Sequence, residues 1–213
     1  ITTSNAANNN VDINGAVVIS GTVAIDTDTA GTDGTIDFSS TIDGAGGTDN
    51  LSIQSGTGAL TLTGIIGAGT SLDTLNINTD AGTAAITIAG LGDTDAAGAI
   101  TTNIGNSTTS NMTFGGTYFR SSGDLTVTTA AGAGTIDFTG AARVVSTGGY
   151  AVSFVGGSIL LADGADLTIN TNISNAASNG GNISIAGAIA GTSDEDLTLT
   201  TGTAGTGTVS VHA

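Results

Sequence analysis

The chain has 213 residues, a length that suits one domain with a sizeable core. It carries two arginines and no lysine against 18 Asp and Glu, for a formal charge of −16, and it lacks cysteine and proline. This composition excludes disulfides and thiolate metal sites, and it argues against binding to nucleic acid or to an anionic membrane, because both attract clustered Lys and Arg. No apolar run approaches the ~18 residues of a membrane-spanning helix.

The rest of the composition favours a fold of many short β-strands. Glycine accounts for 35 residues, and hydrophobic residues for 38% of the chain, of which few are aromatic. Ile, Val and Leu are spread evenly, which a disordered low-complexity chain would not show. β-Branched residues favour strands, and the lack of proline leaves nearly every backbone N–H available for ladder hydrogen bonds.

The first ten residues, ITTSNAANNN, differ from the rest by being polar throughout. We expect 1–10 to form an N-terminal cap or a junction, and 11–213 to form the repeats of a single domain. The chain begins with Ile1 rather than Met, which suggests a processed protein or a fragment of a longer one.

From residue 11 onward an apolar residue recurs about every 25 positions. The five residues GTIDF at 34–38 return at 134–138, and we take Ile36 as the reference. Equivalent residues, spaced 23 to 26 apart, are Val11, Ile36, Leu60, Ile86, Met112, Ile136, Ile159, Ile183 and Val209. A second apolar residue follows two positions after each, usually across a polar one, and this alternation is typical of a strand with one buried face.

Two further apolar segments follow in most repeats. Short ones lie at 39–44, 63–67 and 186–191. A Leu-x-apolar pattern forms the other, at Leu51–Ile53, Leu75–Ile77, Leu125–Val127, Leu167–Ile169 and Leu197–Leu199, with a looser version at Val23–Ile25. Corners rich in Gly, Ser, Thr, Asn and Asp separate the segments, so each repeat should hold three short strands.

Strands this short cannot bury an apolar face alone, but stacked copies can. The sequence therefore predicts an all-β fold, a right-handed parallel β-solenoid (β-helix) with about eight coils of about 25 residues and a roughly triangular section. A β-sandwich also has many short strands, but it gives no reason for so regular a spacing.

Segments 49–67 (DNLSIQSGTGALTLTGIIG) and 122–140 (SGDLTVTTAAGAGTIDFTG) show the repeat most completely. They resemble repeats of large bacterial surface and secreted β-solenoid proteins, namely filamentous-haemagglutinin-like adhesins, autotransporter passengers and very long β-strand-repeat surface proteins. The resemblance runs from about residue 11 to 213. It implies export to the cell surface or the medium and a structural or adhesive role, and it carries over no catalytic residue.

An acidic segment at 26–37 matches part of a calcium-binding loop. Asp26, Asp28, Gly31 and Asp37 take positions 1, 3, 6 and 12 of an EF-hand loop. Ala30 at position 5 and the absence of flanking helices depart from it, so the segment is either a calcium site or a solvated acidic corner. The acidic segments 92–98 and 193–197 are interpreted as solubilising charge.

Two other charged pairs follow from the repeat. Asp12 and Asp37 should stack as like charges in adjacent coils, either sharing a cation or splaying into water. Arg120 and Arg143 should share one side of the rod near Tyr118 and Phe119. This arginine pair is either a patch for an anion, a sugar or an acidic neighbour, or two solvated residues whose stems cover apolar surface.

Apart from the possible calcium site at Asp26, Asp28 and Asp37, the sequence indicates no cofactor or metal site. No catalytic residue is assigned, and the chain is not expected to be an enzyme. His212 should be exposed near the end, without a nucleophile beside it. N-x-Ser/Thr triplets are attributed to chance in so Ser/Thr-rich a chain, and they begin at Asn106, Asn111, Asn172 and Asn182.

The sequence favours a structural or adhesive module of an extracellular fibre or surface protein. Its last residues, GTVSVHA, stop inside a strand pattern, which predicts either a longer array or copies that stack end to end. A host surface or a polysaccharide is a further partner to consider.

The alternatives are a polysaccharide-binding or polysaccharide-cleaving β-helix, which needs suitable carboxylates, and an ice-binding solenoid, which needs a regular Thr-x-Thr array. Two of the six predicted outward pairs are Thr/Thr: Ala24/Asp26, Ser52/Gln54, Asn76/Asn78, Thr126/Thr128, Thr168/Asn170 and Thr198/Thr200.

Overall fold

The computed structural model describes nine stretches of the chain, which together contain 22 β-strands. These stretches are 9–28, 33–46, 48–78, 84–93, 98–105, 111–129, 134–173, 180–202 and 207–212. They contain no helix, and so none that is long and apolar enough to cross a membrane.

The strands form three columns of parallel pairs, which we call faces A, B and C. Face A comprises β1 (Val11–Ile13), β4 (Ile36–Phe38), the first part of β7 (Leu60–Ile66) and of β9 (Ile86–Leu91), β11 (Met112–Phe114), β14 (Thr135–Phe138), β17 (Ser158–Leu161) and β20 (Ile189–Gly191). Face B comprises β2 (Val17–Ile19), β5 (Ile42–Gly44), the last part of β7 and of β9, β12 (Tyr118–Ser121), β15 (Arg143–Thr147), β18 (Leu167–Asn170) and β21 (Leu197–Thr200). Face C comprises β3 (Thr22–Asp26), β6 (Asn50–Gln54), β8 (Leu72–Ile77), β10 (Ala99–Gly105), β13 (Leu125–Thr128), β16 (Val152–Val155), β19 (Ile183–Ile185) and β22 (Val209–Val211).

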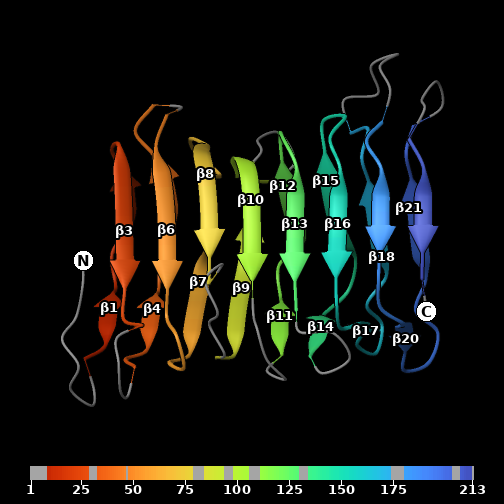
Figure 1. The fold of residues 1–213 in the computed structure, drawn as a ribbon, viewed down its shortest axis with the longest axis horizontal. Coiled ribbons are helices and arrows are strands. Elements are labelled where there is room, and N and C mark those ends of the chain that lie inside the picture. Colours follow the sequence, from red (N-terminus) through yellow and green to blue (C-terminus); the bar gives the residue numbers. More distant parts are fainter. Residues whose placement is uncertain are drawn as a thin grey trace.

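One pass over faces A, B and C makes one coil, and each strand pairs in parallel with its counterpart in the next coil. In Figure 1 the front strands point down and those behind point up while the chain advances from left to right, which is a right-handed winding. The fold is therefore the all-β, parallel β-solenoid that the sequence predicts, three-sided and right-handed, with one strand of each face in every coil.

The repeated GTIDF segment shows why these residues form a coil. Ile36 and Phe38 point inward and are fully buried, whereas Asp37 between them points outward. The coils touch closely at the corner before the strand, because a Cβ on Gly34 would overlap the carbonyl oxygen of Asn9 in the previous coil. Glycine is required there for that close approach. The same inward pair recurs one hundred residues later, at Ile136 and Phe138.

Four phenylalanines link the three faces in the middle of the rod. Phe114 and Phe138 stack on face A with ring centroids 5.2 Å apart. Phe119 of face B meets Phe114 edge to face at 4.9 Å, and Phe154 of face C meets Phe138 edge to face at 6.1 Å. Such pairs add about 0.5 to 1.5 kcal/mol beyond the burial of their area.

The register differs from the sequence prediction in the last two coils. Ile159 pairs with Ile189, 30 residues later, and not with Ile183. Ile183 and Val209 instead continue face C, in register with Val152. Residues 171–182 separate β18 from β19 in the sequence, whereas 122–124 suffice between β12 and β13. The longer connection therefore moves the apolar spacing from face A to face C.

The Leu-x-apolar segments are also divided between two faces. Leu51, Leu75 and Leu125 lie on face C, in register along the ladder. Leu167 and Leu197 pair with one another on face B. The sequence assigned these segments to one column because apolar alternation looks the same on every inward face.

Thr102 is a polar residue in the inward column of face C. It lies between Leu75 and Leu125 in register, is fully buried, and its Oγ1 has no hydrogen-bond partner among the described residues. A buried hydroxyl without a partner costs free energy relative to an apolar group of the same shape.

We therefore expect Thr102→Val to raise the free energy of unfolding by about 1 kcal/mol, measured by urea denaturation. The control is Thr126→Val, at an outward, partly exposed position on β13. That change should stay within about 0.5 kcal/mol of the wild type. A destabilised Thr102→Val variant would show that the hydroxyl does find a partner.

Candidate functional site

Asn and Asp side chains carry the hydrogen-bond ladder past the ends of the strands. A residue directly before a strand accepts, through its side-chain oxygen, the backbone N–H of the equivalent residue in the next coil. The four pairs are Asn10 with Thr35 (3.0 Å), Asp124 with Ala151 (2.9 Å), Asp166 with Asp196 (3.0 Å) and Asn182 with Thr208 (3.0 Å). They occur on all three faces, so this is a general device of the coil.

Other carboxylates bind corner N–H groups in the same way. Asp33 accepts the N–H and the hydroxyl of Thr57 at 2.7 and 2.8 Å. Asp49 is buried and accepts the N–H groups of Gly21 at 2.6 Å and Gly46 at 2.7 Å. These bonds, the one from Gly21 first, lower the pKa of Asp49. Several acidic residues are thus structural acceptors as well as solubilising charges.

The densest acidic corner is the segment at 193–197 that the sequence marked. Asp163, Asp194 and Glu195 bring one carboxylate oxygen each within 4.8 Å of one another. The Ser193 hydroxyl lies 2.8 Å from both Asp163 and Asp194. Among the described residues, this is the one group of three or more acidic or histidine side chains whose oxygen and nitrogen atoms could hold a metal ion.

Glu195 is held by its own corner. It accepts the backbone N–H groups of Thr192 at 2.7 Å and Ser193 at 2.9 Å, and the Thr192 hydroxyl at 2.7 Å. The bond from Ser193 and that hydroxyl lower the pKa of Glu195 to about 2. The carboxylate therefore closes a turn between β20 and β21.

The predicted calcium loop is spread over two elements. Asp26 accepts the N–H of Asp28 at 2.9 Å at the end of β3, whereas Asp37 belongs to β4. Gly31 and Ala30 lie outside the described residues. The carboxylates of Asp26, Asp28 and Asp37 do not form a converging group of the kind found at Asp163. Calcium binding here stays a prediction from the sequence.

The predicted stack of Asp12 and Asp37 is confirmed, since the two residues are in register on face A. Asp12 is exposed and Asp37 is half-buried. One oxygen of Asp37 is buried without a hydrogen-bond partner among the described residues, as is one oxygen of Asp137 in the second GTIDF.

The two arginines lie on the same face, as predicted, but they point to opposite sides of it. Arg120 alternates with the buried Phe119, points outward, and donates to the carbonyl of Asp93. Arg143 points inward and is buried, with Nε donating to the Thr139 carbonyl at 2.6 Å and Nη1 to that of Ala142 at 2.9 Å. Burial lowers the pKa of Arg143. Neither of the two predicted arrangements, a joint patch or two solvated arginines, therefore describes this pair.

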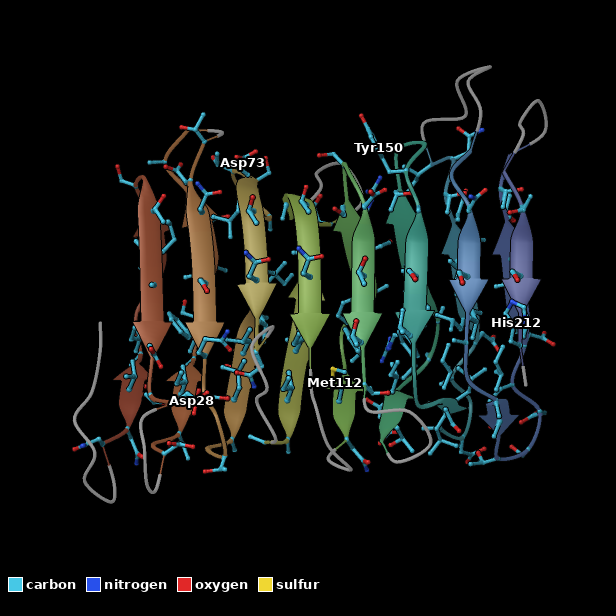
Figure 2. The ribbon with its side chains drawn as sticks, in the orientation of Figure 1. Asp28, Asp73, Met112, Tyr150 and His212 are labelled. Atoms are coloured by element: carbon cyan, nitrogen blue, oxygen red, sulfur yellow. The ribbon has the colours of Figure 1, made fainter. Side chains whose placement is uncertain are left out.

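Other charged side chains on the outer surface lie at separate corners. Figure 2 shows Asp73, at the start of β8, and Asp28, after β3, at opposite ends of face C. His212 is exposed as predicted. The expectation that no nucleophile lies beside it was wrong, because the Ser210 hydroxyl is 2.5 Å from its Nε2. Of the N-x-Ser/Thr asparagines, Asn111 and Asn182 are exposed, Asn172 is buried and Asn106 lies outside the described residues.

The middle outward column of face C runs in register through every coil. It consists of Ala24, Ser52, Asn76, Asn103, Thr126, Ser153, Ser184 and Ser210. Asn103 donates its side-chain amide to that of Asn76 at 3.0 Å. The side chains of this column are small and uncharged and, apart from Ala24, polar, and the column contains a single threonine. The predicted outward pairs Thr168/Asn170 and Thr198/Thr200 belong to face B.

The last described coil has one uncovered edge. Its inward-facing Val209 and Val211 are both 47% exposed, whereas Ile183 and Ile185, their partners in the previous coil, are fully buried. A further coil would cover these side chains.

Comparison of the chain with known protein families, with curated proteins and with solved structures finds no match.

The hydrogen bond between Asp124 and the Ala151 N–H should contribute measurably to the free energy of unfolding. Asp124→Ala removes the acceptor of the Ala151 N–H and should lower the free energy of unfolding by about 1 kcal/mol. Asp124→Asn keeps a side-chain oxygen at the same place and should retain most of the stability. Equal losses in urea denaturation of the two variants would point to charge, and not to the hydrogen bond, as the cause.

The corner at Glu195 makes the fold sensitive to acid. Because its pKa is lowered from 4.5 to about 2, the ionised group stabilises the fold fully above pH 4.5, and that contribution is lost as the pH falls toward 2. The urea midpoint of the wild type should therefore fall more steeply over this range than that of Glu195→Gln. Parallel pH profiles would contradict the assignment, since all other carboxylates are common to both proteins.

Proposed function

We propose that the chain is a non-enzymatic structural module of a bacterial extracellular fibre, filament or large surface adhesin. The observation that carries this proposal is the inter-coil ladder of parallel strands, which at several corners continues through Asn and Asp side chains. Such a rod grows coil by coil without a new kind of contact, because every coil offers the next the same donors and acceptors.

The outer chemistry supports a structural role better than a catalytic one. The acids at the corners are engaged as acceptors of backbone N–H groups, as Asp49 and Asp124 illustrate. Arg143, the cation that an acidic substrate would need, is buried against backbone carbonyls. Face C presents small polar side chains that suit broad, weak contacts with a neighbouring surface or a polysaccharide.

Composition supports the extracellular location. A net charge of −16 keeps a long rod soluble through repulsion between molecules. The lack of lysine and the burial of Arg143 also leave few sites for trypsin-like proteases outside the cell.

Location is tested by labelling intact cells of the source organism with antibodies to this chain and viewing them by electron microscopy. We expect label on the surface or on fibres that extend from it. Label confined to the cytoplasm of sectioned cells would contradict the proposal, and cleavage of acidic glycans by the purified chain would favour the polysaccharide-cleaving alternative.

We also propose that a further coil covers the edge at β22, from a second copy or from a longer parent chain. For a second copy, sedimentation should show end-to-end association that grows with concentration. Val211→Asp should abolish it because the charge would enter the new interface. Val155→Asp is the matched control, since Val155 is 42% exposed on the outer side of face C, away from the edge. A monomer at every concentration would rule out the second copy.

A further inference from the structure

Asn14 and Gly15 form an Asn-Gly pair in the short link between β1 and β2. Asn14, Gly15 and Ala16 are all exposed. In such a pair the backbone nitrogen of the glycine can attack the side-chain carbonyl carbon of the asparagine. Glycine favours this attack because it lacks a Cβ that would hinder the approach and restrict the backbone.

The structure leaves both reacting groups available. The Gly15 N–H makes no hydrogen bond to any residue in the described stretches, although most backbone N–H groups of the coil are bonded to the next coil. A Cβ built on Gly15 would have no heavy atom within 4 Å, so the space around the backbone is open. The Asn14 side chain is bound by one contact, the hydroxyl of Ser39 at 3.2 Å from Oδ1.

Asn10, four residues earlier in the same coil, shows the opposite arrangement. Its Oδ1 accepts the N–H of Thr35 at 3.0 Å. The nitrogen that would attack it belongs to Val11, which is β-branched and donates to the Thr35 carbonyl at 2.9 Å. At Asn10 the side-chain carbonyl and the backbone nitrogen that would attack it are therefore both hydrogen-bonded to the backbone of the next coil. At Asn14 neither the side-chain carbonyl nor the Gly15 nitrogen is bonded to backbone in this way.

We propose that Asn14 is a site of spontaneous deamidation in the folded protein. The Gly15 nitrogen loses its proton and forms a bond to Cγ of Asn14, the bond from Cγ to the side-chain nitrogen breaks, and ammonia leaves. Water then opens the resulting succinimide at one of its two carbonyls. The products are aspartate and isoaspartate at position 14, and no oxidant or cofactor is needed.

The modification would change the first coil in two ways. It adds a carboxylate two positions after Asp12, on the same outward side of the chain, where Asp12 already faces Asp37 in the next coil. In isoaspartate the backbone between β1 and β2 is one atom longer, which works against the pairing of Val17 with Ile42. The proposal does not depend on the function proposed above.

The test is to incubate the purified chain, folded, in mildly alkaline buffer and to follow each asparagine by peptide mapping with mass spectrometry. We expect Asn14 to convert with loss of ammonia and gain of water, faster as the pH rises, and Asn10 to stay intact. The peptide that carries position 14 should gain one negative charge, which separates its conversion from any at Asn179, the other asparagine that precedes a glycine.

Two variants keep the test decisive. Gly15→Ala should fold normally, because Gly15 is not crowded and is not among the residues with positive φ, and it should lose most of the conversion. Asn14→Gln keeps an amide but lengthens the chain to it, and the peptide that carries position 14 should give no acidic product over the same time. The proposal is overturned if Asn14 stays intact, if Asn10 converts as fast, or if Gly15→Ala converts at the wild-type rate.

Discussion

Every coil of this protein must satisfy the backbone of the next one, in the corners as well as in the strands. Parallel strands bond to both neighbours, so an unpaired N–H at a corner would be repeated throughout the stack. The chain meets this constraint with Asn or Asp directly before strands, as at Asn10, Asp124 and Asp166. The same constraint explains the lack of proline, and the close stacking that it brings explains the glycine at position 34, where two coils come too close for a Cβ.

The core follows from the stacking of the coils, and an aromatic cluster joins its faces. Most inward positions are aliphatic and contact their copies above and below, which ties each face together along the rod. The faces are tied to one another where Phe114, Phe119, Phe138 and Phe154 meet in the middle coils. A solenoid is held mainly by contacts between neighbouring coils, so a cluster that spans three faces adds cohesion across the section.

The acidic residues of the surface fall into two groups: some accept backbone N–H groups, and others only carry charge. The net charge alone does not distinguish them. Asp49 and Glu195 bind backbone N–H groups, which lowers their pKa and makes the corners depend on ionised carboxylates. Asp12 and Asp37 face each other as like charges on the outside of face A. The corners of a rod built in this way therefore weaken in acid, as their carboxylates become protonated.

The spacing of apolar residues alone determined that this chain forms a parallel β-solenoid, because only stacked copies bury so regular an alternation. It also identified the inward pair of GTIDF and the register of Asp12 with Asp37. Tertiary structure decided which face each strand joins, since alternation is identical on faces A, B and C, and the greater number of residues between β18 and β19 placed Ile183 on face C. It also decided that Arg143 turns inward and which N–H each carboxylate binds. Those contacts join residues about one coil apart, and they exist only once the coils are stacked in register.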